Sequence, residues 1–154
     1  MIRKLKECEY SILSDFLYEA IFIPEGVTPP DKSIIRIPEL QTYITDFGKN
    51  KGDAALAAEV EDRIVGVVWA RIMEDYGHVD DETPSLSISL YKEYRGLGIG
   101  TQLMEKMLHL LKKRGYKKVS LSVQKANYAV KLYEKTGFKI VSENEEEYIM
   151  VCEL

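Results

Sequence analysis

Apolar residues follow two spacings along the chain, one typical of helices and one typical of strands. The helical spacing first appears after Tyr10, and it predicts a helix from Leu13, Phe16, Leu17, Ala20 and Ile21. Prolines and Gly26 in the next segment end this helix and predict a long loop. Pro38 then opens a second predicted helix, whose shared apolar face before Gly48 consists of Leu40, Tyr43, Ile44 and Phe47.

Strand-like alternation recurs from one end of the chain to the other, with many β-branched and aromatic residues. It predicts strands at residues 2–6, 54–61, 63–73, 86–90, 118–123, 138–142 and 148–152. The polar residues 61–63 predict a turn, so we expect the second and third of these strands to form a hairpin. An acidic turn likewise joins the last two strands into a terminal hairpin.

Two further helices are predicted between the later strands. After a glycine-rich turn, Leu103, Met107, Leu110 and Leu111 form an apolar stripe, and Gly115 ends the helix. A shorter helix at residues 127–135 is closed by Gly137. Helices therefore follow both the 86–90 and the 118–123 strands as crossovers. The fold class is α/β, with a mixed sheet, and no linker or repeat divides the single predicted domain at residues 1–154.

The amino-acid composition limits the kinds of molecule that the protein is expected to bind. The chain has 154 residues, of which 45% are hydrophobic and 30% charged, and its net charge is −4 without a dense basic stripe. These values are typical of a globular domain and argue against a nucleic-acid surface. No apolar run is long enough to cross a bilayer, and the basic start lacks an apolar signal segment, so we expect a cytoplasmic protein. Cys8 and Cys152 have no metal-ligand spacing, and no metal is expected.

The most informative segment runs from the strand at residues 85–90 into Arg95-x-x-Gly98-x-Gly100 and then into a helix. The first N–H groups of a helix lack intrahelical partners, and the helix dipole adds partial positive charge there. Glycines let these amides approach phosphate oxygens closely. The segment therefore predicts a phosphate-bearing ligand. No Gly-Lys-[Ser/Thr] follows, so the turn is not a Walker A loop, and Thr101 makes it a poor dinucleotide fingerprint.

A second motif lies one strand further on, Asn127-x-Ala129-x-x-Leu132-Tyr133-Glu134-Lys135-x-Gly137-Phe138. Together, in this order and spacing, the two motifs resemble the GNAT superfamily of acetyl-CoA-dependent N-acetyltransferases. The resemblance covers residues 54–142 closely and the flanking segments loosely. It implies a central mixed, mostly antiparallel sheet of about six or seven strands flanked by about four helices.

The resemblance also implies acetyl-CoA as co-substrate and a set of site residues. The CoA pyrophosphate would lie on the glycine turn, at Arg95, Gly96, Leu97, Gly98, Ile99, Gly100 and Thr101. The end of the preceding strand, at Ser89, Leu90 and Tyr91, would pair with the pantetheine arm, and Asn127 would bind the same arm. Tyr133 would lie beside the CoA sulfur and protonate the departing thiolate as the catalytic acid.

Several of these residues also have ordinary structural explanations. Asn127 lies where a helix N-cap would, and this role is compatible with ligand binding. Tyr133 alone, without the resemblance, would be read as an amphipathic core residue beside Leu132. Arg95 could be a turn residue that faces solvent and contributes mainly its amide.

Direct attack of an amine on a thioester needs a proton acceptor and a donor for the oxyanion. The main-chain N–H of Leu90 or Tyr91 is the predicted oxyanion donor. The base is left open, because serines at 85, 87 and 89 occupy polar positions where some family members have glutamate. A water chain or one of several nearby residues could serve, namely Glu59, Glu74, Asp75, His78, Asp80, Asp81 or Glu82.

The predicted acceptor is a small-molecule or peptide amine. Its identity would depend on the first two helices, the proline-rich loop and the terminal hairpin, where Tyr10, Tyr18, Phe22, Tyr43 and Tyr148 offer aromatic walls. The alternative function is a non-catalytic acyl-CoA-binding sensor or interaction module. Dimers are common in the family, so a homodimer is compatible with the resemblance.

Overall fold

Seven strands and four α-helices make up the protein in the computed structural model, which describes residues 1–154. The strands are β1 (Ile2–Lys4), β2 (Ala54–Val60), β3 (Arg63–Arg71), β4 (Ser85–Leu90), β5 (Lys118–Gln124), β6 (Lys139–Glu143) and β7 (Glu147–Glu153). The α-helices are α1 (Leu13–Glu19), α2 (Pro38–Gln41), α3 (Ile99–Lys113) and α4 (Ala129–Lys135). Short 3₁₀ helices are η1 (Glu7–Ile12), η2 (Lys32–Arg36) and η3 (Lys92–Tyr94). The predicted mixed α/β fold class is confirmed.

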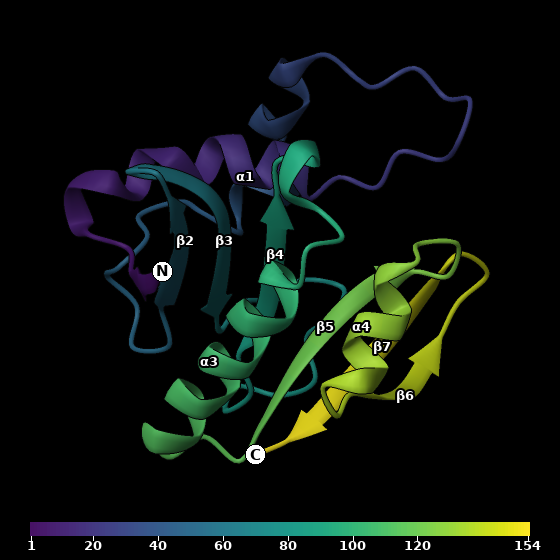
Figure 1. Ribbon diagram of the computed structural model, residues 1–154. Helices are drawn as coiled ribbons and strands as arrows, with labels where there is room; N and C mark the ends of the chain where they lie inside the picture. The colour runs from purple at the N-terminus through teal and green to yellow at the C-terminus, as the bar shows by residue number, and fades with distance from the viewer.

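All strands belong to one sheet in the order β1-β2-β3-β4-β5-β7-β6. Every neighbouring pair is antiparallel except β4 and β5, which run parallel and are joined by α3 (Figure 1). Strand β7 lies between β5 and β6, so α4 crosses from β5 to a strand that is not its neighbour. Both predicted crossover helices are therefore confirmed.

The β2–β3 hairpin turns where the polar segment predicted it. Glu61 and Asp62 have φ angles of 51° and 63°, and two positive φ values in a two-residue turn match the right-handed twist of the strands that flank it. The register shifts between Ala58 and Glu59, whose partners are Gly66 and Ile64, so Val65 is the extra residue of a bulge in β3.

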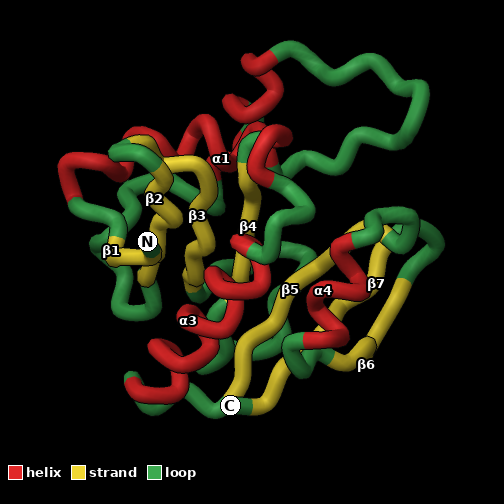
Figure 2. Tube along the Cα trace, viewed as in Figure 1, coloured by secondary structure: helices red, strands yellow, loops and turns green.

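Helices cover both faces of the sheet (Figure 2). On one face, Leu103, Met104, Met107 and Leu111 of α3 are fully buried against a large apolar cluster that also includes Tyr133 of α4. On the other face, Leu13, Phe16 and Leu17 of α1 form a second cluster with Val67 and Trp69 of β3. None of the helices is both long enough and apolar enough to cross a membrane.

The second predicted helix is wrong over most of its length. Helix α2 ends at Gln41, and residues 42–48 form successive turns instead. The carbonyls of Thr42 and Thr45, which a continued helix would use for its own bonds, accept hydrogen bonds from the buried Arg71 guanidinium. Asp46 then adopts a φ of 53°, which no helix contains. A tertiary contact thus overrides the local pattern.

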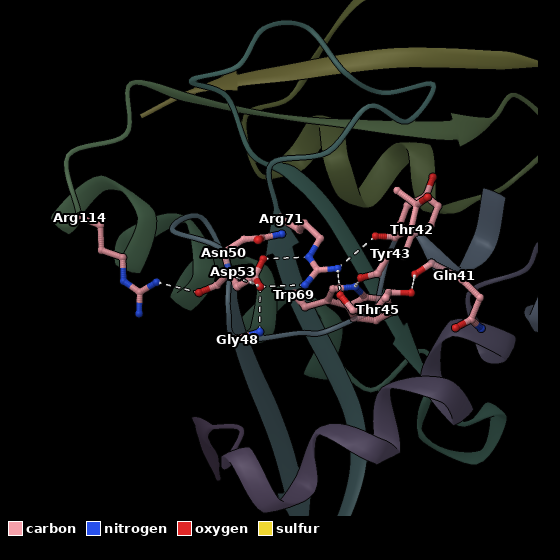
Figure 3. A network of polar contacts seen from close by, with 10 residues as sticks. All are labelled: Gln41, Thr42, Tyr43, Thr45, Gly48, Asn50, Asp53, Trp69, Arg71 and Arg114. Carbon is pink, nitrogen blue, oxygen red and sulfur yellow. Dashed lines mark hydrogen bonds and ion pairs between the residues drawn. The ribbon is translucent and has the colours of Figure 1, made fainter. Parts of the chain in front are cut away.

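Arg71 is the centre of a buried polar network (Figure 3). Its Nε and Nη2 each lie 2.9 Å from a carboxylate oxygen of Asp53, and the two side chains are only 3% and 1% exposed. Asp53 also accepts the N–H of Gly48 at 2.8 Å. The network therefore fastens residues 42–53 to the end of β3, and the sequence offered no motif that marked it.

Replacing Arg71 with methionine should destabilise the protein by about 3–5 kcal/mol, because the Asp53 carboxylate would stay buried without its partner. Urea unfolding followed by circular dichroism would measure the change in the free energy of unfolding. The exposed Arg36 offers a matched control, and Arg36→Met should change stability by about 0.5 kcal/mol or less. Equal effects of the two substitutions would contradict the role of the buried pair.

Candidate active site

Strands β4 and β5 pair at one point only and then separate. Their parallel contact is between Ser85 and Ser120, and Figure 1 shows the two strands diverging beyond it. On its other side β4 is fully paired with β3, and the N–H of Tyr91 donates to the Val65 carbonyl at 3.0 Å. Backbone groups alternate in direction along an antiparallel strand, so those of Ile88 and Leu90 face the gap. Apart from the Leu90 carbonyl, which accepts from the Nε of Arg95, these backbone groups of β4 are unpaired.

The glycine turn follows directly after this edge. Gly96 and Gly98 have φ angles of 76° and 86°, which strongly favour glycine, and α3 begins at Ile99. The first helical bond is from the N–H of Gln102 to the Gly98 carbonyl, at 3.2 Å. The amides of residues 96–101 donate to no acceptor within the protein. Free amides at the positive end of a 15-residue helix make a site suited to an anion such as a pyrophosphate.

The side chain of Arg95 turns back from the glycine turn rather than into solvent. Its Nε donates to the Leu90 carbonyl at 2.9 Å, and its Nη2 donates to the Glu19 carbonyl at 3.3 Å. The Arg95 amide is also engaged, because it donates to the Lys92 carbonyl at 3.2 Å. Arg95 therefore joins the end of β4 to the end of α1.

A cleft of about 770 Å³ lies over the gap and the glycine turn. Its walls come from β4, the glycine turn, α4 and the segment that follows α1. Of the predicted site residues, nine line it: Ser89, Leu90, Arg95, Gly96, Gly98, Gly100, Thr101, Asn127 and Tyr133. The fold thus brings together residues from three separate parts of the sequence.

Three predicted residues do not line the cleft. Leu97 is 65% exposed, and Ile99 packs against the apolar cluster beneath α3. The ring of Tyr91 packs on Phe16, with centroids 4.8 Å apart, and the Arg63 guanidinium lies over the ring, 5.0 Å from its centroid. Because the Tyr91 amide is bonded to Val65, Leu90 is the better placed of the two predicted oxyanion donors.

Tyr133 is buried on α4, yet its hydroxyl has no hydrogen-bond partner in the protein and is not sealed from the cleft. Burial raises the pKa of this phenol to about 12. The group is therefore protonated throughout the neutral range and can act as a proton donor. Its ring lies 6.0 Å from that of Phe138, which helps to fix its position.

Asn127 has the capping role that its sequence position predicted. Its Oδ1 accepts the N–H of Ala129 at 2.9 Å, and its carbonyl accepts the N–H of Val130 at 3.2 Å. The Nδ2 group makes no hydrogen bond in the protein. The cap consequently leaves one donor for a ligand in the cleft.

None of the predicted candidates for the base lines the cleft. Glu59 pairs with Arg3 at 2.9 Å on the β1–β2 side of the sheet. His78 lies in the β3–β4 loop, with Nδ1 2.8 Å from the Met73 carbonyl and Nε2 3.3 Å from Asp81. The cleft does contain one carboxylate that sequence reasoning missed, Glu19. Nothing in the local pattern marks it, since its place depends on how α1 crosses the end of β4.

No group of three or more His, Cys, Asp or Glu side chains is placed to hold a metal ion. The chemistry that the cleft offers comes from backbone amides, the Tyr133 phenol and one carboxylate; three further tyrosines, Tyr18, Tyr94 and Tyr128, also line it. This set suits binding of a phosphate-bearing thioester and transfer of its acyl group.

Comparison with known proteins agrees with this geometry. The profile of the Acetyltransferase (GNAT) family matches residues 17–138. An N-alpha-acetyltransferase of Sulfurisphaera tokodaii is 32% identical over 138 residues, which cover 78% of this chain and 82% of that protein. A probable N-acetyltransferase camello of Xenopus tropicalis is 38% identical over 85 residues, 53% of this chain, but the match spans only 36% of its own length.

Solved structures share the fold. The PaiA N-acetyltransferase of Thermoplasma acidophilum, determined in complex with coenzyme A, matches with a TM-score of 0.73 and 21% identity over 100% of this chain and 98% of that one. The sheet order, the glycine turn and the match over most of the sequence lead to one conclusion. The chain belongs to the GNAT family of acetyltransferases.

Proposed function

We propose that the protein transfers the acetyl group of acetyl-CoA to the α-amino group of a peptide or protein, by direct attack within a ternary complex. The observation that carries the proposal is the single cleft that joins the free amides of residues 96–101, the open edge of β4 and the Tyr133 hydroxyl. The choice of an α-amine rests on the archaeal relatives of 30–32% identity named N-alpha-acetyltransferases, which align over most of their length.

Donor binding follows from the two sets of unpaired backbone groups. The amides at the start of α3 would hold the pyrophosphate, with Gly96 and Gly98 giving the turn its conformation. The backbone groups of Ile88 at the edge of β4 would pair with an amide of the pantetheine arm as an added strand does, while the Leu90 carbonyl already accepts from Arg95 Nε. Asn127 would contribute its free Nδ2.

The transfer step needs charge stabilisation and two proton movements. The Leu90 N–H faces the gap and would donate to the thioester oxygen as negative charge develops on it. The Tyr133 phenol would give its proton to the departing sulfur. A peptide α-amine with a pKa near 8 is about one-tenth neutral at pH 7, so the acceptor must also lose a proton.

The first test is acetyl-CoA-dependent release of thiol with a panel of acceptors at pH 7. The panel holds 20-residue peptides starting with Ala, Gly, Ser or Met, the same peptides with blocked N-termini, spermidine and an aminoglycoside. Acetylation of free but not blocked N-termini is expected. Turnover of only spermidine or the aminoglycoside would overturn the α-amine assignment, and tight acetyl-CoA binding with no turnover would favour a binding module.

Gly98→Ala should weaken CoA binding about 5- to 30-fold, because the left-handed φ of 86° costs an alanine about 1–2 kcal/mol and a shifted turn would misplace the free amides. Isothermal titration with CoA measures the dissociation constant. Gly115→Ala is the matched control: Gly115 has a φ of 94° at the other end of α3, so its replacement should cost similar stability but leave affinity unchanged. Unchanged affinity in both variants would remove Gly98 from the site.

Tyr133→Phe should lower kcat about 10- to 1,000-fold, because the sulfur would leave without a proton donor. The dissociation constant of acetyl-CoA should change less than about threefold, since the phenol acts only during transfer. Steady-state kinetics and titration give the two values. Tyr116→Phe, outside the cleft, should be fully active. Full activity of Tyr133→Phe would exclude the phenol as the acid.

A further inference from the structure

Glu19 is the only carboxylate that lines the cleft, and no histidine lines it. The other charged side chains in its walls are those of Lys92 and Arg95, both cations. The segment that follows α1 contributes only uncharged residues, namely Ala20, Ile21, Phe22, Ile23, Pro24, Val27 and Pro29. The Glu19 carboxylate, in the last turn of α1, is therefore the one acidic or histidine side chain in the cleft that could take up a proton.

The position of Glu19 relative to β4 is the second observation. Helix α1 packs on the face of the sheet opposite α3, where Ser89 donates to the Phe16 carbonyl at 2.6 Å. The glycine turn leads into α3 on the other face. Because the cleft extends across the end of β4, Glu19 and the free amides lie on opposite sides of this strand end. An acceptor that approaches from the α1 side would meet Glu19 before it reached the donor.

Arg95 fixes this arrangement. Its Nη2 lies 3.7 Å from the Glu19 carboxylate, and its Nε is bonded to the carbonyl of Leu90, the residue whose amide faces the gap. The Glu19 side chain is 21% exposed, so it can still contact an acceptor. The contact with Arg95 is long for an ion pair, which leaves carboxylate lone pairs free for an ammonium group or a bridging water.

We propose that Glu19 is the catalytic residue that takes the proton from the attacking amine, directly or through one water molecule. The inference rests on the proposed function, because it assigns the acceptor side of that same site. It also explains how the chain can lack a glutamate at the polar positions of β4, where Ser85 and Ser89 are instead bonded to Asp75 and Phe16.

The proposed step balances without any further reactant. The amine nitrogen forms a bond to the acetyl carbon, and the carbon–sulfur bond breaks. An α-ammonium gives its first proton to the Glu19 carboxylate before attack, and Glu19 passes that proton to solvent. Glu19 then takes the second proton, which the nitrogen loses as the amide forms, and the sulfur takes the proton of Tyr133. Solvent then removes the proton from Glu19 and returns one to Tyr133, so the cycle closes.

Glu19→Gln keeps the size of the side chain and the backbone contact with Arg95, so it tests the carboxylate alone. With acetyl-CoA and an unblocked Gly-starting peptide at pH 7, kcat/KM should fall about 100-fold, while CoA affinity and the melting temperature stay unchanged. Glu93→Gln, an exposed neighbour in η3 outside the cleft, should behave as wild type.

A second acceptor separates proton removal from a purely structural role. An aminooxyacetyl peptide of the same sequence presents a nitrogen that is already neutral at pH 7, so the loss in Glu19→Gln should shrink to less than about tenfold. Equal losses with both peptides, or full activity of Glu19→Gln with the Gly-starting peptide, would overturn the assignment. Failure of the wild-type protein on every amine would instead overturn the proposed function itself.

Discussion

The separation of β4 from β5 is the constraint on which the rest of the site depends. Parallel pairing stops after Ser85 and Ser120, and the backbone groups of Ile88 and the N–H of Leu90 are left facing a gap. Unpaired backbone groups on a central strand cost folding free energy if they are buried, because amide and carbonyl groups removed from water need hydrogen-bond partners. The gap is opened to a cleft, so a ligand that carries amides can complete the sheet.

The glycine turn and α3 place an anion-binding group of amides at one end of this gap. Helix α3 buries its apolar face so that its first amides stand at the end of β4. Gly96 and Gly98 turn the chain there with positive φ angles, and residues 96–101 keep their amides free. Arg95, which the glycine motif placed among the phosphate contacts, instead uses its side chain to tie β4 to α1. Its role in the site is therefore one of positioning.

Two polar side chains near α4 show how one residue can serve both fold and function. Asn127 caps the helix with its oxygen and retains free N–H groups toward the cleft. Tyr133 packs its ring in the core, and this burial raises the pKa of a hydroxyl that no protein group satisfies. Packing thus supplies the protonated, unpaired donor that an acyl transfer to an amine would use. Both residues therefore have structural roles, and each keeps one polar group free for its proposed role in the site.

The strands, the two crossover helices, the glycine turn and the family could be predicted from the amino-acid sequence, because they depend on short-range periodicity and on residues with special backbone geometry. The sequence could not determine the end of α2, since the carbonyls of Thr42 and Thr45 are taken by Arg71, which is more than 25 residues away. Nor could it identify Glu19 as a cleft residue, because its partner Arg95 belongs to a distant segment. Both points required the three-dimensional arrangement, because ion pairs and cleft walls join side chains whose separation along the chain carries no periodic signal.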